Sequence, residues 1–332
     1  MKIVVLDGYT LNPGDNPWTE LEQLGELTVH ERTDPAQVVA RALPGQVLLT
    51  NKAPVNAQSI ADLPSLRYIG VLATGHNIVD GRAAAARGVP VTNVPEYGTR
   101  SVAQFVFALL LELCHRVGHH DQAVHRGEWA RRGDFSFWDS PLVELAGKTL
   151  AVVGFGRIGR RVGELGRAFG MEVLAVDPER GPAERAGAPP QERAYAAPSD
   201  APFAWASLPE ACARADVLSL NCALTAENRN LVNAALLAAM KPSAFLINAA
   251  RGPLVDEAAL AAALNAGALA GAALDVVAEE PIRADNPLLS ARNCLLTPHI
   301  AWATLEARRR LMHEAAENLR AFLAGGVRNR VN

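Results

Sequence analysis

Few folds accommodate the stretch "TLAVVGFGRIGRRV", residues 149–162. Apolar residues lead directly into Gly154, Gly156 and Gly159, and a helical pattern begins at once after them. The G-x-G-x-x-G spacing alone is weak, because glycine is common, but a strand before it and a helix after it are the context that the motif requires. The stretch therefore predicts a parallel sheet that binds a dinucleotide.

Each glycine of this motif has its own physical role. Gly154 permits a tight turn, Gly156 lets the backbone approach a pyrophosphate, and Gly159 lets helix and strand pack closely. The helix N-terminus supplies amide donors and a positive dipole to the phosphates. Asp177 ends the next predicted strand, "EVLAVD", 18 residues beyond Gly159. A carboxylate there binds ribose hydroxyls and repels a 2′-phosphate, which favours NAD over NADP, and nearby Arg180 keeps that preference open.

Short strand-like runs alternate with helical patterns along the whole chain. From residue 149 onward six runs are typical of strands, which is the number that a full dinucleotide-binding sheet needs. The first third contains four more, "IVVLD", "VLLT", "YIGVL" and "VPVTNV". Between the two sets, "SVAQFVFALLLELCHRVG" is apolar nearly all round, which indicates a buried connecting helix. We therefore expect an α/β chain of two domains with mostly parallel sheets.

Three stretches stand apart from this alternation. Residues 126–148 carry aromatic side chains and turn signals, and residues 181–204, rich in Pro and Ala, are interpreted as a surface insertion. The arginine-rich "EARRR" of residues 306–310 is expected to be a solvated helix face. It belongs to a final helix marked by apolar residues at helical spacing: Leu311, Ala315, Leu319 and Phe322. We expect this helix to fold back onto the first domain.

Composition argues against several classes of partner. The net charge of −3 and pI of about 6.3 give no electrostatic footprint for nucleic acid. The longest apolar run, "FVFALLL", is far shorter than the ~20 residues that span a bilayer. His115 and His119 lack a matching cysteine or carboxylate, so a structural or interface role is favoured over a metal site. The cysteines are scattered, so we expect reduced thiols in a cytoplasmic protein.

Three polar residues follow the last strands of the predicted nucleotide-binding sheet. Arg251 follows "INAA", Glu280 follows "LDVVAE" and His299 follows "LLTP". Ligands of open α/β sheets bind beyond the carboxyl ends of the strands, so these side chains should meet in one crevice. Taken singly, each has an ordinary alternative: a surface arginine, a solvated glutamate or a core histidine. Their order after a nucleotide motif favours a common site.

Such a set suits hydride transfer to a carbonyl group. Reduction leaves an alkoxide that needs a proton, and histidine titrates nearest neutral pH. Glu280 bonded to the ring would favour the imidazolium, and Arg251 could hold a substrate carboxylate in a two-pronged grip. Asp275 is a lone carboxylate in an apolar strand, which needs a hydrogen-bond partner such as a cofactor amide. Asp256, before a helical run, is most simply an N-cap.

Together, "VVGFGRIG", "VLAVD", "INAARG", "LDVVAEEP" and "TPHIAW" resemble the D-isomer-specific 2-hydroxyacid dehydrogenases over essentially the whole chain. "KIVVLDGYTLNPGD" and "GDFSFWDSPLVELAGKT" look most like the glycerate dehydrogenase (hydroxypyruvate reductase) branch. The resemblance implies two doubly wound parallel-sheet domains: a Rossmann NAD-binding domain, residues 101–302, inserted into a flavodoxin-like substrate domain, residues 1–100 and 303–332. It also implies a homodimer whose interface is residues 115–145, with Trp138 reaching towards the partner's active site.

The resemblance also implies roles for single residues. Arg251 would bind substrate, His299 would be the acid/base and Glu280 its partner. The backbone amides of Thr74 and Gly75, in "VLATGHNIVD", would receive the substrate carboxylate together with Arg251 and His299. The implied cofactor-binding residues are Gly154, Gly156, Arg157, Ile158, Gly159, Asp177, Cys222, Ala249, Ala250 and Asp275.

The implied activity is reversible hydride transfer between NADH and a small 2-keto acid, best hydroxypyruvate or glyoxylate, giving D-glycerate or glycolate. Phosphohydroxypyruvate, pyruvate and bulkier acids stay open as substrates, although no basic cluster for a substrate phosphate is evident. Glu280 argues against the formate dehydrogenases, which carry glutamine at that place. An NAD-sensing, corepressor-like binding protein can keep the same three residues, so that class stays open too. The direction of the reaction in the cell is not fixed by the sequence.

Overall fold

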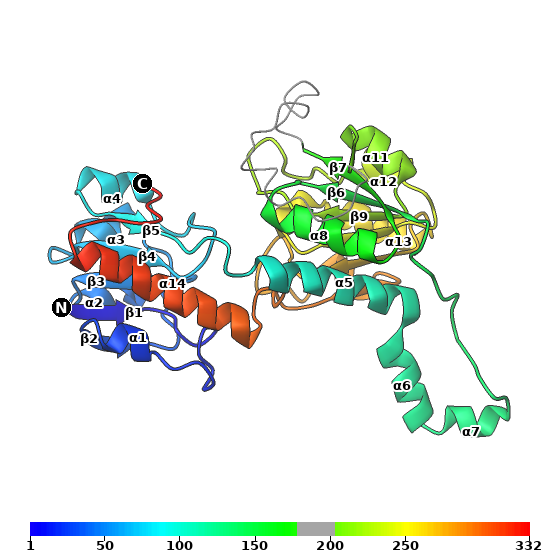
Figure 1. The fold of residues 1–332 in the computed structure, drawn as a ribbon, viewed down its shortest axis with the longest axis horizontal. Coiled ribbons are helices and arrows are strands. Elements are labelled where there is room, and N and C mark those ends of the chain that lie inside the picture. Colours follow the sequence, from blue (N-terminus) through cyan, green and yellow to red (C-terminus); the bar gives the residue numbers. More distant parts are fainter. Residues whose placement is uncertain (178–202) are drawn as a thin grey trace. The chain divides into compact units, whose positions relative to one another are not determined.

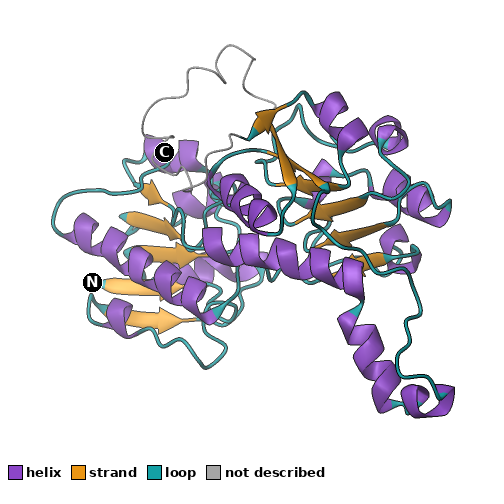
Figure 2. Cartoon of the chain, turned by 45° about the vertical axis from the view of Figure 1, so that its right-hand side comes forward, coloured by secondary structure: helices purple, strands orange, loops and turns teal. Residues whose placement is uncertain are grey.

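A computed structural model describes residues 1–177 and 203–332 of the chain. The chain forms two compact units, one made of Met1–Ser101 with Trp302–Asn332 and the other of Val102–Ala301. Each unit contains one sheet, and all paired strands in both sheets are parallel (Figures 1 and 2). The predicted α/β class with two parallel sheets is confirmed. Arg180 and most of the stretch 181–204 lie outside the described residues.

The first unit contains a five-stranded sheet in the order β2-β1-β3-β4-β5. The strands are β1 (Lys2–Val5), β2 (Glu26–Val29), β3 (Val47–Thr50), β4 (Tyr68–Val71) and β5 (Val91–Thr92). The four runs expected from the sequence are β1, β3, β4 and β5. The sequence analysis missed β2, because this edge strand is mostly exposed and carries no apolar run.

Short helices connect these strands. They are α1 (Thr19–Glu22), η1 (Pro35–Gln37), α2 (Val38–Ala42), α3 (Ala57–Ala61) and α4 (Gly81–Ala86). The last helix, α14 (Leu305–Leu323), lies against β4 and α1. Its apolar repeat is buried in the same cluster as Ile3, Val5 and Tyr68, and the rings of Tyr68 and Phe322 lie 4.9 Å apart. The final helix is therefore part of the core of the first unit.

The arginine-rich segment of α14 is only partly solvated. Arg309 and Arg310 are exposed, but the expectation is wrong for Arg308, which is buried because it lies on the helix face of Leu311. The guanidinium of Arg308 donates to both carboxylate oxygens of Asp15 at 2.5 and 2.7 Å. This hydrogen bond lowers the pKa of Asp15 below its usual value. Arg308 thereby fixes the loop that follows β1.

The second unit contains a seven-stranded sheet in the order β12-β11-β10-β9-β6-β7-β8. The strands are β6 (Thr149–Val153), β7 (Glu172–Val176), β8 (Ala204–Trp205), β9 (Val217–Leu220), β10 (Phe245–Asn248), β11 (Gly271–Leu274) and β12 (Cys294–Leu296). The six predicted runs are all strands. The seventh, β8, is too short to give a sequence signal, and it begins at a residue that the sequence analysis assigned to the insertion.

Helices cover both faces of this sheet. They are α5 (Thr99–His115), α8 (Arg157–Ala168), α11 (Leu208–Arg214), α12 (Ala234–Ala239) and α13 (Glu257–Asn265), with the short η2 (Gly252–Leu254) and η3 (Pro287–Ser290). Alternate residues of β6 point into different apolar clusters, Leu150 and Val152 into one and Ala151 and Val153 into the other. A sheet buried on both faces leaves its strand ends as the place where ligands can bind.

A hairpin of two helices extends from the second unit (Figure 1). It contains α6 (Val117–His125) and α7 (Glu128–Arg132), followed by an extended return to β6. We call residues 115–145 the arm. In the described part of the chain no single helix is long and apolar enough to cross a membrane; α5 and α6 reach that length only together, with a bend of 55° between them.

Candidate active site

The glycine-rich turn lies where the strand order of the second sheet reverses. The chain leaves β6 for β7 on one side, whereas β9 flanks β6 on the other. Gly154 has a φ of +88°, and a Cβ there would lie 2.4 Å from the backbone nitrogen of Cys222. A Cβ on Gly159 would lie 2.1 Å from the carbonyl oxygen of Gly154. Only glycine fits at either position.

Gly156 differs from the other two, because a Cβ there would meet only open space. It is the N-cap of α8, which starts at Arg157 and Ile158, and as a glycine it has no side chain to cap this helix. Asp177 is half-buried directly after β7, and Cys222 follows β9. A 12-residue helix with glycine at its N-cap, open space beside Gly156 and a carboxylate at the neighbouring strand end fit the phosphates and ribose of a dinucleotide.

The loop after β10 presents Arg251 at the same edge of the sheet. Asn248, which is fully buried at the end of β10, donates to the carbonyl oxygen of Arg251 at 2.9 Å and accepts from the amide of Ala250 at 3.1 Å. These bonds shape the turn that contains Ala249. The exposed guanidinium of Arg251 donates to the Ala250 carbonyl at 2.7 Å. The sequence analysis did not identify Asn248, whose only signal is a polar residue at the end of an apolar run.

Glu280 and His299 form a hydrogen-bonded pair beyond the ends of β11 and β12. The Nδ1 atom of His299 lies 2.7 Å from Oε2 of Glu280. The side chains are 27% and 36% exposed, so the pair lies at the surface of the unit and is accessible from solution. Because β10, β11 and β12 are successive neighbours in the sheet, Arg251 leaves the adjacent strand end. With Nδ1 engaged by the carboxylate, Nε2 is the ring atom that can serve a substrate.

A buried carboxylate holds the turn that carries His299. Asp275 is 1% exposed and accepts from the Thr297 hydroxyl at 2.7 Å and from the amides of Ile300 and Ala301 at 2.9 and 2.8 Å. Its carbonyl oxygen accepts from the His299 amide at 2.7 Å. His299 itself has a φ of +56°, a left-handed conformation that costs free energy unless neighbours enforce it. The hydrogen bonds that a buried carboxylate needs are therefore supplied by the chain itself.

The predicted substrate loop belongs to the first unit. Thr74 and Gly75 follow β4, and the Thr74 hydroxyl donates to the carbonyl of Val94 at 3.0 Å while Asn93 donates to the carbonyl of Thr74 at 2.8 Å. A second ordered loop lies at the end of β3, where Asp7 accepts from the amides of residues 51–53. The sequence analysis gave Asp7 no role, although a carboxylate directly after β1 is the signal that could have identified it.

Other polar candidates have ordinary structural partners. The Asp256 carboxylate accepts from the amide of Ala259 at 3.0 Å and is the N-cap of α13 that its position predicts. Burial raises the pKa values of three cysteine thiols to about 11: Cys114, Cys212 and Cys294. Within residues 1–177 and 203–332 no three histidine, cysteine, aspartate or glutamate side chains are grouped to hold a metal ion.

A proton donor beside a dinucleotide cradle is what a nucleotide-dependent dehydrogenase requires. Comparison with known protein families identifies which class of dehydrogenase this is. Residues 107–301 match the NAD-binding domain of the D-isomer specific 2-hydroxyacid dehydrogenases. The chain belongs to this family, as the sequence motifs predicted, and is an oxidoreductase that acts on 2-hydroxy acids.

Relatives of full length support this assignment. The chain is 47% identical to a hydroxypyruvate reductase of Blautia hydrogenotrophica over 100% of both chains. It is 35% identical to a glycerate dehydrogenase of Methylorubrum extorquens, over 99% of this chain and 98% of that one. Among solved structures, an NADPH-dependent glyoxylate/hydroxypyruvate reductase of Sinorhizobium meliloti, in complex with NADP and malonate, is 31% identical, with a TM-score of 0.79 over 99% of this chain and 96% of that one.

Proposed function

We propose that this enzyme uses NADH to reduce hydroxypyruvate to D-glycerate and glyoxylate to glycolate. The observation that carries the proposal is the 2.7 Å hydrogen bond between His299 and Glu280 at the carboxyl edge of a dinucleotide-binding sheet. The names of the relatives, hydroxypyruvate reductase and glycerate dehydrogenase, support the choice of substrate. Reductases of pyruvate, phosphohydroxypyruvate or bulkier 2-keto acids are the alternatives that the assay below separates.

The three catalytic residues have complementary tasks. The dinucleotide supplies the hydride that converts the carbonyl to an alkoxide. Nε2 of His299 gives its proton to that oxygen, and Glu280 stabilises the imidazolium through Nδ1. Arg251 holds the substrate carboxylate and polarises the carbonyl. General acid help of this kind contributes about 10²–10⁴-fold to the rate.

The roles proposed for the other binding residues follow from the resemblance to the family, and their place in the fold supports them. The amides of Thr74 and Gly75 receive the substrate carboxylate. The pyrophosphate binds at Gly154, Gly156, Arg157, Ile158 and Gly159, and Asp177 binds the adenosine ribose. The remaining cofactor-binding residues are Cys222, Ala249, Ala250 and Asp275. For Asp275 the nicotinamide amide is an additional partner beside the three hydrogen bonds that its carboxylate accepts from the chain.

Steady-state kinetics test the proposed substrate and the proposed preference for NADH. Initial rates of NADH and NADPH oxidation are compared with hydroxypyruvate, glyoxylate, pyruvate and phosphohydroxypyruvate. We expect hydroxypyruvate to give the highest kcat/KM, and NADH to be preferred by about tenfold or more because Asp177 repels the 2′-phosphate. Equal use of NADPH would contradict the role of Asp177. NADH binding without turnover of any acid would replace the enzyme assignment with a sensor of the corepressor type.

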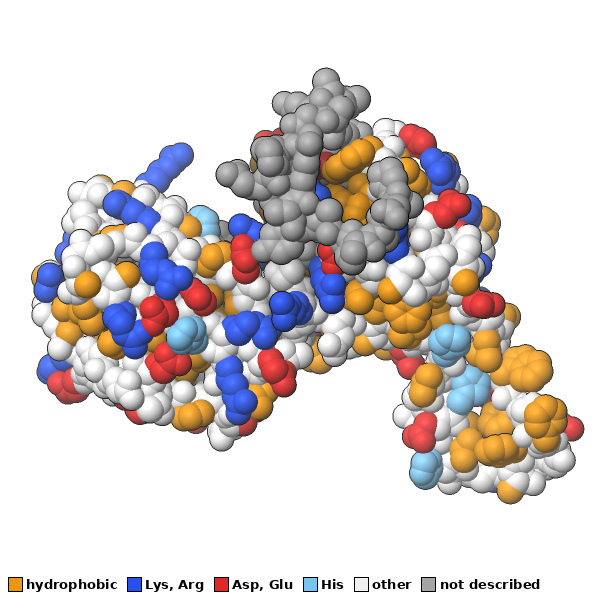
Figure 3. Space-filling model, viewed as in Figure 1, with side chains coloured by type: hydrophobic (Ala, Val, Ile, Leu, Met, Phe, Trp, Pro, Cys, Tyr) orange, Lys and Arg blue, Asp and Glu red, His pale blue; other side chains and the backbone are white. Residues whose placement is uncertain are grey.

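We also propose that the arm joins two copies of the chain into a homodimer. The arm exposes large apolar side chains, which Figure 3 shows gathered there: Val117, Val124, Trp129, Phe135, Trp138 and Leu142. Most of them line a hollow of about 470 Å³. Contiguous exposed apolar surface of this kind marks a protein interface. We place Trp138 at the partner's active site, and the enzyme in the cytoplasm, where its cysteines, which form no disulfide bond, stay reduced.

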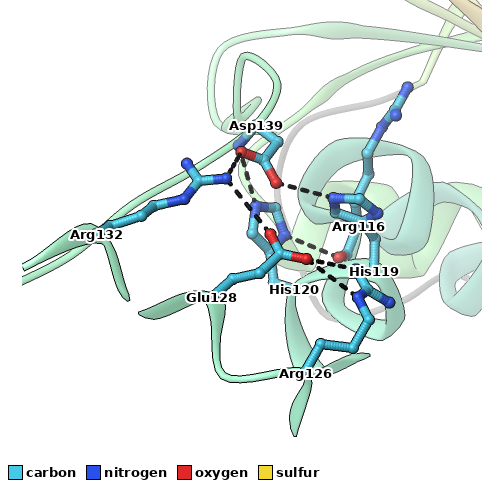
Figure 4. A network of polar contacts seen from close by, with 7 residues as sticks. All are labelled: Arg116, His119, His120, Arg126, Glu128, Arg132 and Asp139. Atoms are coloured by element: carbon cyan, nitrogen blue, oxygen red, sulfur yellow. Dashed lines mark hydrogen bonds and ion pairs between the residues drawn. The ribbon is translucent and has the colours of Figure 1, made fainter. Parts of the chain in front are cut away.

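Polar contacts hold the arm in shape despite this exposure (Figure 4). Asp139 pairs with His119 at 3.1 Å and with Arg132 at 2.7 Å, and Glu128 pairs with Arg126 at 3.0 Å. The hydrogen bonds from His119 and Arg132 lower the pKa of Asp139 below its usual value. A charged network that ties the helices to the return segment preforms the apolar surface for a second copy.

The double variant Phe135→Ser/Trp138→Ser tests the dimer. Removing two aromatic anchors, each worth about 2 kcal/mol, should convert the dimer to a monomer at micromolar concentration. Light scattering coupled to gel filtration should then give the one-chain mass of 35.3 kDa. Leu43→Ser, which changes an apolar side chain of the first unit that is 52% exposed, is the control and should remain a dimer. A one-chain mass for the unaltered protein would refute the proposal.

A further inference from the structure

We infer that Glu257 is a positioning residue for the hydrogen-bonded pair of His299 and Glu280, because it holds the loop that carries Glu280. The effect of Glu257 on catalysis rests on the proposed function. Glu257 lies in the first turn of α13, and its Oε1 atom accepts from the amide of Ala278 at 2.7 Å. Its Oε2 atom accepts from the side-chain amide of Asn286 at 2.9 Å. One carboxylate thus binds both ends of the loop 278–286.

This loop has little other support. Residues 278–285 are all exposed, so packing does not fix their conformation. Three of its charged side chains pair with one another: Arg283 lies 2.9 Å from Asp285 and 3.8 Å from Glu279. The Asn286 side chain is itself oriented, because its Oδ1 accepts from the amide of Leu288 at 3.0 Å. Its amide donor must therefore point to Glu257.

The same region joins the loop of Arg251 to the loop of Glu280. A Cβ on Gly252 would lie 1.9 Å from the carbonyl carbon of Val277, so the two backbones are in direct contact. Glu280 in turn accepts from the amide of Val277 at 3.3 Å and bonds His299 at 2.7 Å. Fixing Ala278 from α13 therefore fixes the backbone from which Glu280 reaches the imidazole.

A simpler role for Glu257, capping its own helix, is already filled. Asp256 accepts from the amide of Ala259 and is the N-cap of α13. The two oxygens of Glu257 instead contact groups 21 and 29 residues away in the sequence. Bonds over that distance shape the site rather than the helix.

The test replaces Glu257 by glutamine, which keeps the size but turns one acceptor into a donor that opposes the Asn286 amide. We expect kcat for hydroxypyruvate to fall by about 10- to 100-fold with little change in the KM for NADH, because displaced catalytic groups lose rate rather than binding. The alkaline limb of the kcat–pH profile should move to lower pH, since a displaced Glu280 stabilises the imidazolium less.

Two further variants make the result specific. Glu257→Gln/Asn286→Asp exchanges donor and acceptor, restores both contacts and should recover most of the lost kcat. Glu210→Gln removes the matching first-turn glutamate of α11, which is exposed and pairs with Arg214 of its own helix, and should leave the kinetics unchanged.

A second readout separates this inference from the proposed function. The imidazole of His299 is titrated by NMR in the substrate-free protein, with its signal assigned from the His299→Gln variant. Its titration midpoint should move to lower pH in Glu257→Gln and return in the double variant. An unchanged midpoint would overturn the positioning role, whether or not the protein reduces hydroxypyruvate. A lower kcat with an unaltered pH profile and no rescue would also overturn it.

Discussion

Replacing His299 by glutamine should lower kcat for hydroxypyruvate reduction by at least ~10²-fold while the protein still folds and binds NADH. Glutamine can keep a hydrogen bond to Glu280 but has no proton to give at neutral pH. Because Asp275 fixes the turn from the backbone side, the loss should appear in the rate and not in folding. Steady-state kinetics, NADH binding by fluorescence and thermal melting measure the three quantities.

The chain contains a matched control for this experiment. His313 on α14 bonds Glu20 through Nδ1 at 2.9 Å, so it has the same partner type and geometry as His299. His313→Gln should leave kcat unchanged. Undiminished turnover in His299→Gln would show that the proton comes from another group.

Replacing Arg251 by lysine should lower kcat/KM by about 10- to 100-fold, although the positive charge is kept. Lysine cannot supply the planar fork that holds a carboxylate through two hydrogen bonds. A lost hydrogen bond to a charged group costs about 1.5–3 kcal/mol, which corresponds to that range. The turn itself should persist, because Asn248 bonds only backbone atoms there. Kinetics with hydroxypyruvate as the varied substrate give the value.

Arg214→Lys provides the comparison for Arg251→Lys. Arg214 forms an exposed ion pair with Glu210 on α11, and the same substitution there should change neither kcat nor KM. A normal kcat/KM in Arg251→Lys would show that the substrate carboxylate is held mainly by the amides of the first unit. The proposed grip would then be wrong.

The buried strands could be predicted because each is a continuous apolar run that ends at a turn signal. The glycine motif also predicted the tight turn between β6 and α8, where only glycine fits at Gly154 and Gly159. Two strands could not be predicted, each for a different reason. β2 is an exposed edge strand without an apolar pattern, and β8 has only two residues. The spacing of hydrophobic residues reflects burial, so elements that are exposed or very short show no such pattern.

The pairing of Glu280 with His299 could be predicted because they lie in the loops that follow the neighbouring strands β11 and β12. The supporting roles of Asn248 and Glu257, and the partners of Asp275, could not be predicted. Asn248, Asp275 and Glu257 act on backbone amides and carbonyls, which every residue possesses, so nothing in the sequence marks their partners. Arg308 illustrates the same limit: the other two arginines of "EARRR" are exposed, and only the packed helix shows that this arginine is buried.

The division of the first unit between the two ends of the chain affects the order in which the protein folds during synthesis. The ribosome makes the sheet of the first unit first but supplies α14, which covers part of its core, last. Synthesis of the intervening residues, Val102–Ala301, takes about 10–40 s at ~5–20 residues per second. The second unit is continuous and can complete its own core in that interval. Until α14 emerges, the apolar surface around Tyr68 that this helix covers stays exposed to solvent.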